Sequence, residues 1–175
     1  MMETLANHWM AITVAVTGTL VVAVVGGWLT EIGPWYRSLT FPSWKPPDWA
    51  FGPIWTTILA LAVVSMVMAW AAAASPAARA LVVGLFVVNG ALNVGWNLLF
   101  FTMRRPDLAL VEVAFLWLSI LALIVGLAPI SPIAALLLVP YLVWVGIAAF
   151  LNLRIVRLNA PFTGAGARSH GTIGR

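Results

Sequence analysis

The strongest constraint on the fold of this chain is a series of long apolar segments. Five stretches of about 20 residues contain almost no charge: residues 9–29, 51–74, 80–102, 108–127 and 133–153. Because a helix rises about 1.5 Å per residue, each stretch can cross the roughly 30 Å hydrocarbon core of a bilayer. The sequence therefore predicts an all-α membrane protein built as a bundle of five transmembrane helices.

Composition excludes several kinds of chemistry. Hydrophobic residues make up 63% of the chain and charged residues 8%, whereas roughly a quarter of a soluble domain is charged. No cysteine is present, and the two histidines, His8 and His170, lie near opposite ends of the chain without metal-ligand spacing. We therefore expect no metal site and no obligatory cofactor.

The positive charges predict how the chain is oriented in the membrane. With five spans, the loops after the first and third stretches share one side with the C-terminus. That side carries all but one of the basic residues: Arg37, Lys45, Arg104, Arg105, Arg154, Arg157, Arg168 and Arg175. Positive loops stay in the cytoplasm, so we expect the N-terminus outside and the C-terminus cytoplasmic. The net charge of +4 is a topology signal, and no nucleic-acid partner is expected.

Most connections between the apolar stretches are short, as in a compact bundle of antiparallel neighbours. Ser131 is expected to cap the last helix, with Pro132 at its first position. We expect residues 1–159 to form one membrane domain and residues 160–175 to form a mobile cytoplasmic tail.

The exception is the loop at residues 30–50, which leads into the run FPSWKPPDWAFGPIW at 41–55. This run holds four prolines and three tryptophans. Prolines break helices but fix φ, which lowers the entropy cost of ordering a loop. We expect residues 40–49 to be non-helical and stiff, and the next helix to begin at Gly52-Pro53.

The third apolar stretch has two distinct sides. Asn89, Asn93 and Asn97 recur every four residues, so they share one side of the helix. Amide groups would be unpaired in lipid, so this side faces the bundle interior, where it either lines a binding site or only ties helices together. Two aromatic residues lie on or beside it: Trp96 and Phe100. The opposite side has a small pair suited to contact with a neighbouring helix or a second subunit: Ala91 and Gly95.

The fifth stretch carries a stripe of unequal side chains. Trp144 and Ala148 lie one turn apart, and Tyr141 precedes Trp144 by three residues. Pro140 removes a backbone donor and is expected to kink the helix. A large indole beside a small alanine forms a wall with a recess that suits a flat ligand, and ordinary packing is the alternative.

One acidic residue, Glu112, lies inside an apolar stretch, about one turn from its basic end. Intramembrane carboxylates are costly, so Glu112 could relay protons or bind a ligand. Because Arg104 and Arg105 are close in sequence, we expect it instead to be ion-paired or solvated. Only Asp107 is near enough to serve as a second acid, so an acid–base pair is weakly indicated.

The chain contains ten tryptophans. Those near helix ends fit the aromatic belt at the membrane interface: Trp9, Trp28 and Trp35. Others lie well within the spans, where the belt offers no explanation: Trp55, Trp96, Trp117 and Trp144. Buried indoles present wide apolar faces and one N–H donor each, which would suit a large, flat, poorly soluble molecule.

Four motifs in order resemble the TspO/MBR family, the tryptophan-rich sensory proteins and mitochondrial translocator proteins. They are WY at 35–36, FPSWKPPDWAFGPIW at 41–55, ALNVGWNLLFF at 91–101, and VPYLVW with AFLN at 139–152. The resemblance covers about residues 28–159 and includes the order and spacing of the five apolar stretches. The pattern W-x-P-P-x-W-x-x-G-P-x-W within this topology makes the match specific.

The resemblance implies a five-helix bundle, often a homodimer, with a ligand pocket beneath the loop after the first helix. Family members bind porphyrins, and eukaryotic members also bind cholesterol and synthetic benzodiazepine-type ligands. The positions expected to line the pocket are Trp55, Asn93, Trp96, Phe100, Tyr141, Trp144 and Ala148. The proline-stiffened loop becomes a lid over this pocket, formed by Trp35, Tyr36, Trp44, Pro46, Pro47 and Trp49.

Two positions depart from the family pattern. Phe41 stands before the first loop proline, where lysine is usual, which weakens a basic contact. Leu153 stands where the sterol-recognition pattern of animal members has tyrosine, so that pattern is absent.

We therefore expect a membrane receptor or sensor for protoporphyrin-like tetrapyrroles and other flat apolar ligands. No His or Cys in the spans could serve as an axial ligand to haem iron, so metal-free porphyrin fits better. The alternatives are a tetrapyrrole or sterol transporter, a scaffold, and a light-dependent porphyrin-degrading enzyme. For some bacterial members the resemblance implies degradation through two pocket tryptophans, here Trp55 and Trp144, although no conventional catalytic dyad is present.

Overall fold

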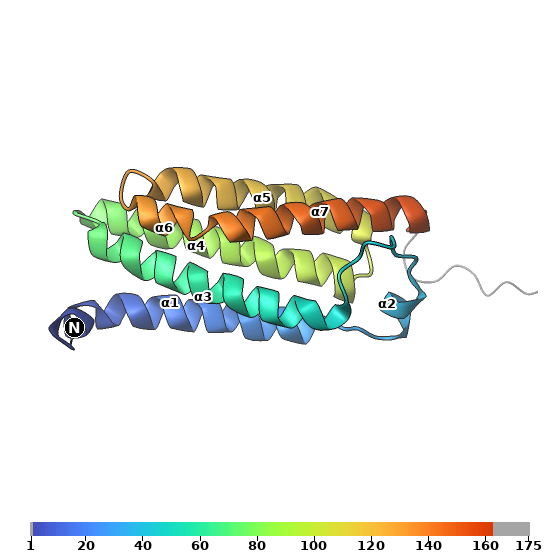
Figure 1. Cartoon of the computed structure of the whole chain (residues 1–175), viewed down its shortest axis with the longest axis horizontal. Helices are drawn as coiled ribbons and strands as arrows, with labels where there is room; N and C mark the ends of the chain where they lie inside the picture. The colour runs from blue at the N-terminus through green and yellow to red at the C-terminus, as the bar shows by residue number, and fades with distance from the viewer. Residues whose placement is uncertain (1, 163–175) are drawn as a thin grey trace, which may run out of the picture.

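The computed structural model describes residues 2–162 of the chain, and it consists of helices that run side by side (Figure 1). Five helical segments are long and apolar enough to cross a membrane, which confirms the predicted five-helix bundle. The elements in order are α1 (Met2–Leu29), α2 (Pro34–Ser38), α3 (Asp48–Ala72), α4 (Pro76–Asn97), the π-helical turn η1 (Leu98–Thr102), α5 (Pro106–Leu127), α6 (Pro132–Leu136) and α7 (Val139–Asn159). The protein is therefore an integral, multi-pass membrane protein.

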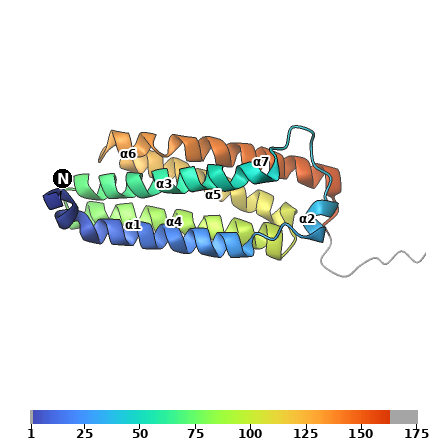
Figure 2. The ribbon, with the colours of Figure 1, turned by 60° about the horizontal axis from the view of Figure 1, so that its bottom comes forward.

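Helices that follow one another in sequence lie beside one another in space. The helix α4 packs against α1, α3 and α5, while α5 packs against α6 and α7. The helix α3 also contacts α1 and α6, so it links the first helix of the bundle to the last membrane segment. Figure 2 shows α3 between the α6–α7 segment and the α1–α4 pair. Short turns between consecutive helices account for this arrangement.

Proline and serine mark the starts of several helices. Proline occupies the beginning of α2, α4, α5 and α6, where its missing N–H costs no intrahelical bond. Ser75 caps α4 by accepting a bond from the N–H of Ala78 at 3.1 Å. Ser131 caps α6 in the same way at 3.4 Å from the N–H of Ala134, as the sequence predicts.

The start of α3 differs from the prediction. Asp48 and Trp49 were expected to be non-helical, but α3 begins at Asp48, directly after Pro47. Pro47 has φ −62° and ψ 146°, an extended conformation that leads into the first turn. Pro53 lies inside the helix near its N-terminus, where it removes only one intrahelical bond. The proline-rich run therefore ends in a helix one turn earlier than its prolines indicate.

The last membrane segment is interrupted where the sequence places Pro140. The helix α6 ends at Leu136, and α7 begins at Val139. Between them, the N–H of Leu138 donates to the carbonyl of Ala135 at 3.1 Å. The carbonyl of Ala134 instead accepts a bond from the hydroxyl of Ser65 on α3 at 2.7 Å. The break is thus stabilised by a polar side chain from a neighbouring helix.

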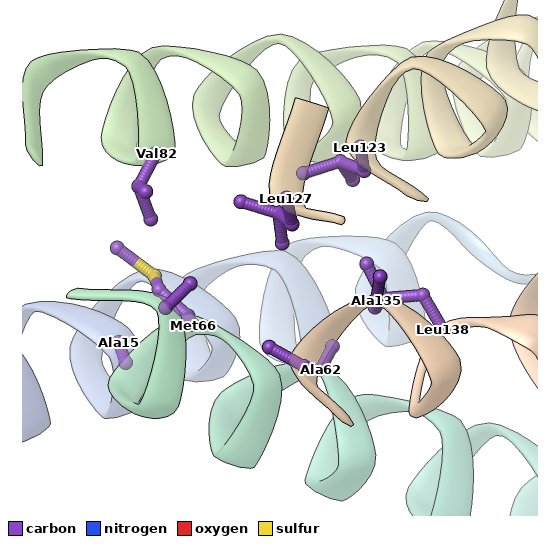
Figure 3. Packing of buried hydrophobic residues seen from close by; sticks show 10 residues of the cluster. Ala15, Ala62, Met66, Val82, Leu123, Leu127, Ala135 and Leu138 are labelled. Atoms are coloured by element: carbon purple, nitrogen blue, oxygen red, sulfur yellow. The ribbon is translucent and has the colours of Figure 1, made fainter. Parts of the chain in front are cut away.

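The half of the bundle that contains α6 is filled by small and aliphatic side chains. Figure 3 shows this packing, in which Ala15, Ala62 and Ala135 let helices approach closely around Met66 and Leu127. Most polar and aromatic side chains of the interior lie toward the other end, where α2 is located. That end holds the predicted site.

Candidate functional site

Two buried asparagines tie α4 to two different helices. The Nδ2 atom of Asn89 donates to the Oγ atom of Ser119 on α5 at 2.8 Å. The Nδ2 atom of Asn93 donates to the hydroxyl of Tyr141 on α7 at 3.0 Å. Both asparagines are buried, so the polar side of the helix faces the bundle interior, as predicted.

Asn97, the third asparagine, connects α4 to the end of α1. Its Oδ1 atom accepts a bond from the hydroxyl of Thr30 at 2.9 Å, and its Nδ2 atom donates to the backbone carbonyl of Asn93 at 2.9 Å. Gly26 of α1 packs directly against this amide, since a Cβ atom there would lie 3.4 Å from Nδ2. Each of the three asparagines therefore forms a hydrogen bond to a different part of the bundle. All three connect helices, whether or not they also contact a ligand.

Aromatic side chains join α3 to α7 at the level of Tyr141. The rings of Trp55 and Tyr141 meet edge to face, with centroids 6.0 Å apart. The rings of Phe51 and Trp144 do the same at 5.6 Å. These are favourable aromatic geometries. They bring together two tryptophans, Trp55 and Trp144, that lie far apart in sequence.

A second group of rings extends from α4 toward the loop. Trp96 stacks on Phe100 with centroids 5.1 Å apart, and Trp35 meets Phe100 edge to face at 6.1 Å. Trp96 also packs, together with Trp55 and Trp144, against one buried cluster that includes Tyr141. We call these rings the aromatic cluster: Phe51, Trp55, Trp96, Phe100, Tyr141 and Trp144. Among the remaining predicted pocket positions, Ala148 is half-buried on α7, one turn beyond Trp144.

Two indole groups of the aromatic cluster have unsatisfied donors. The Nε1 atoms of Trp96 and Trp144 are buried and have no hydrogen-bond partner within residues 2–162. A buried polar group without a partner typically costs about 1–3 kcal/mol. Both groups could therefore bond favourably to an acceptor on a ligand.

Tyr36 is the buried centre of the segment between α1 and α3, residues 30–47, which we call the lid segment. Its ring packs against Phe41 and Phe101 at 4.9 and 5.8 Å, and its hydroxyl donates to Asp48 Oδ1 at 3.3 Å. Lys45 pairs with Asp48 and lies over the Tyr36 and Phe41 rings. Burial and the nearby Asp48 carboxylate raise the pKa of Tyr36, so its hydroxyl remains a donor at neutral pH.

The lid segment is also attached to the end of α7. The N–H of Thr40 donates to Asn159 Oδ1 at 2.8 Å, and Asn159 Nδ2 donates to the carbonyl of Thr40 at 2.9 Å. Figure 1 shows the segment crossing the end of the bundle between α2 and α3. These bonds hold the lid segment over that end of the helices.

The tryptophans of the lid segment and the first turn of α3 contribute unequally. Trp44 stacks on Phe150 of α7, with centroids 5.4 Å apart. Trp49 lies on the first turn of α3 and is 76% exposed, so its ring makes little contact with the bundle end in this packing. Pro46 is half-buried and Pro47 is exposed.

A cavity of about 310 Å³ lies between α1, α3 and α4. Its wall includes Asn89, Asn93 and Tyr141, and most of its lining is aliphatic. Of the predicted pocket residues, only Asn93 and Tyr141 line it; the tryptophans of the aromatic cluster do not. In this packing each of those tryptophans contacts another aromatic ring: Trp55 contacts Tyr141, Trp96 contacts Phe100 and Trp144 contacts Phe51.

Comparison with known proteins matches residues 13–158 to the TspO/MBR family. The chain belongs to the TspO/MBR family. It is 38% identical over 125 residues to a tryptophan-rich protein TspO of Chlorobaculum tepidum, which covers 71% of this chain and 79% of that protein. It is 36% identical to a translocator protein of Sus scrofa, covering 81% and 88%. It is 33% identical to a tryptophan-rich sensory protein of Cereibacter sphaeroides, covering 76% and 82%.

In this TspO/MBR protein, Glu112 differs from the sequence-based expectation. It was expected to be ion-paired or solvated, but both carboxyl oxygens are buried and have no partner within residues 2–162. Arg105 does not reach it, because its guanidinium binds Asp107 through two hydrogen bonds of 2.8 and 2.6 Å. A basic neighbour in sequence was therefore a poor guide to the partner of this acid.

The two small residues predicted to form a dimer face lie in different surroundings. A Cβ atom on Gly95 would lie 3.7 Å from Oε1 of Glu112, so Gly95 faces α5 of the same TspO/MBR chain. Ala91 is exposed and lines the cavity between α1, α3 and α4. A contact between two copies of the chain through Ala91 stays a prediction.

Sequence reasoning missed several residues that support this TspO/MBR site. They are the partners of predicted residues: Thr30, Asp48, Ser119 and Asn159. One signal was available, because buried amides in a membrane helix require polar partners on neighbouring helices. Ser119 is one of the few polar residues in the stretch at 108–127 and is such a candidate.

Proposed function

We propose that this protein is a membrane receptor or sensor that binds porphyrin-like tetrapyrroles at the aromatic cluster beneath the lid segment. The observation that carries the proposal is the pair of buried indole N–H groups of Trp96 and Trp144 without acceptors. A tetrapyrrole offers a wide apolar ring for the indole faces and peripheral oxygen atoms for unsatisfied donors. Two relatives are named a sensory protein and a translocator protein, and sensing and translocation both begin with binding of a ligand.

Binding at this place would require the rings to separate. The contacts between Phe51 and Trp144 and between Trp55 and Tyr141 join α3 to α7 across the proposed site. The first residue of α3, Asp48, accepts a hydrogen bond from Tyr36 of the lid segment, so α3 and the lid segment are directly connected. A ligand that parts α3 from α7 would therefore also move the lid segment, and this coupling would suit a receptor or sensor.

Tryptophan fluorescence tests the proposal. We expect protoporphyrin IX to quench the intrinsic fluorescence of the purified protein saturably. Replacing Trp55 or Trp144 with alanine should weaken binding roughly ten- to hundredfold, the range for losing a buried aromatic anchor. Thermal unfolding measured on the same samples would show that the variants remain folded.

Trp49→Ala is the matched control, because it removes an indole that is 76% exposed and lies outside the aromatic cluster. Its affinity for protoporphyrin IX should equal that of the wild type. Saturable quenching with unchanged affinity in both Trp55→Ala and Trp144→Ala would refute the assigned site.

We also propose that the end with the lid segment is cytoplasmic, with the N-terminus outside. The basic residues among the described part of the chain support this orientation. Arg37, Lys45, Arg104 and Arg105 lie in or beside the connections at the lid end, whereas Arg79 lies in the first turn of α4, at the other end. Such an excess of positive charge is typical of cytoplasmic loops.

Single cysteines test the orientation directly, because the chain contains none. In intact cells, a membrane-impermeant maleimide should label Ala74→Cys, in the exposed turn between α3 and α4, but not Ser43→Cys in the lid segment. After the cells are permeabilised, both should react. The reverse labelling pattern would show the opposite orientation.

A further inference from the structure

We propose that Glu112 is an intramembrane proton-binding site, and that its carboxyl group carries a proton when α4 and α5 are packed together. The site consists of the carboxyl group on α5 and the facing backbone of α4 at Gly95. Its ligand is the proton itself. This site is separate from the porphyrin-binding role and stands whether or not that role is correct.

The geometry shows a carboxyl group enclosed by helices. Both oxygens of Glu112 are buried, and neither has a hydrogen-bond partner within the described part of the chain. Gly95 presents only a hydrogen atom, since a Cβ placed there would approach Oε1 to 3.7 Å. The carboxyl group of α5 therefore lies directly beside the backbone of α4, at van der Waals distance from the position that a Cβ of residue 95 would take.

No cation compensates this group. On the elements packed against α5, the other charged or titratable residues are Arg79 on α4 and Tyr141, Arg154 and Arg157 on α7; η1 and α6 have none. Asp107, on α5 itself, is bound to Arg105. Among the side chains of residues 9–162, the only ion pairs are Lys45–Asp48 and Arg105–Asp107, so none of their basic nitrogens lies within 4.0 Å of the Glu112 carboxyl group.

An unpaired carboxylate in this position would be far more costly than a neutral acid. Burying an isolated charge forfeits its hydration without a compensating partner, whereas a protonated carboxyl loses only hydrogen bonds. Protonation therefore favours the packed arrangement of α4 and α5. By linkage, separation of the two helices favours loss of the proton.

The route for exchange is short. Glu112 follows the start of α5 at Pro106 by six residues, about 9 Å along a helix. On release, the carboxyl O–H bond breaks, the proton passes to water at the lid end, and the carboxylate retains the electron pair. Because both carboxyl oxygens are buried while α4 and α5 are packed together, exchange with water requires the two helices to separate there.

Infrared difference spectroscopy of the full chain in lipid nanodiscs tests the proposal. At neutral pH the wild type should show the C=O stretching band of a protonated carboxyl, with a shift in D₂O. The band should disappear in Glu112→Gln and remain unchanged in Glu31→Gln, which removes an exposed acid. As the pH rises, loss of the band should coincide with loss of amide protection in residues 92–97, measured as the exchange rate relative to the intrinsic rate at the same pH, and Glu112→Gln should keep its protection.

Three results would overturn the proposal. The first is the absence of a protonated-carboxyl band at neutral pH, and the second is a band that persists in Glu112→Gln. The third is failure of Glu112→Gln to fold, because a neutral side chain of the same shape should be accepted where a protonated acid is. Quenching by protoporphyrin IX, measured on the same variants, reports separately on the porphyrin site.

Discussion

Replacing Tyr36 with alanine is expected to release the lid segment from the end of the bundle. Tyr36 is buried, packs against Phe41 and Phe101, and holds Asp48 through its hydroxyl. Losing a buried aromatic side chain typically costs about 3–5 kcal/mol. Because Tyr36 lies in the short helix α2 between α1 and α3, we expect the loss to appear mainly as local opening of the lid segment. Hydrogen exchange of residues 39–47 measures it directly, and protection there should largely disappear.

The same variant should bind protoporphyrin IX more weakly, if the lid segment closes over the ligand. Trp49→Ala is again the control, because this larger but 76% exposed ring should leave exchange unchanged. Tyr36→Phe separates packing from hydrogen bonding, since it removes only the 3.3 Å bond to Asp48. Unchanged protection of residues 39–47 in Tyr36→Ala would show that the Thr40–Asn159 bonds alone hold the lid segment.

The number of membrane helices could be predicted because length and hydropathy are properties of each segment alone. Each of the five apolar stretches is long enough to cross a membrane as a helix, and all five are helical in the structure. The position of Pro140 also predicted a disturbance in the last segment. Sequence could not show its form, because the carbonyl of Ala134 that the break frees is bonded by Ser65, a residue on a different helix.

The candidate site was harder to predict because it depends on pairings between helices. Periodicity placed Asn93 on the inner side of its helix, but only the structure pairs it with Tyr141. Glu112 shows the same limit more sharply. Its distance in sequence from Arg105 favoured an ion pair, yet Asp107 competes for that guanidinium at closer range. Helical spacing gives the direction of a side chain, whereas the partner depends on rotation and depth of neighbouring helices.

Ser65→Ala is expected to destabilise the protein at the junction between α6 and α7. Ser65 is fully buried, and its hydroxyl donates to the carbonyl of Ala134 at 2.7 Å. In a continuous helix this carbonyl would accept from the N–H of Leu138, but that N–H donates to Ala135 instead. Removing the hydroxyl leaves the carbonyl buried without this donor. Such a loss costs about 1–3 kcal/mol, and the surrounding lipid supplies no water to replace the bond.

Thermal unfolding in detergent or nanodiscs should therefore show a lower midpoint for Ser65→Ala than for the wild type. Thr57→Ala is the matched control on the same helix, because the hydroxyl of Thr57 is exposed and bonds only the carbonyl of Pro53 in its own helix. Its midpoint should change little. Hydrogen exchange adds a local test, since residues 134–139 should lose protection in Ser65→Ala before the rest of α7 does. Equal midpoints for Ser65→Ala and Thr57→Ala would mean that the junction is held by the apolar packing around Leu138 and not by the hydrogen bond.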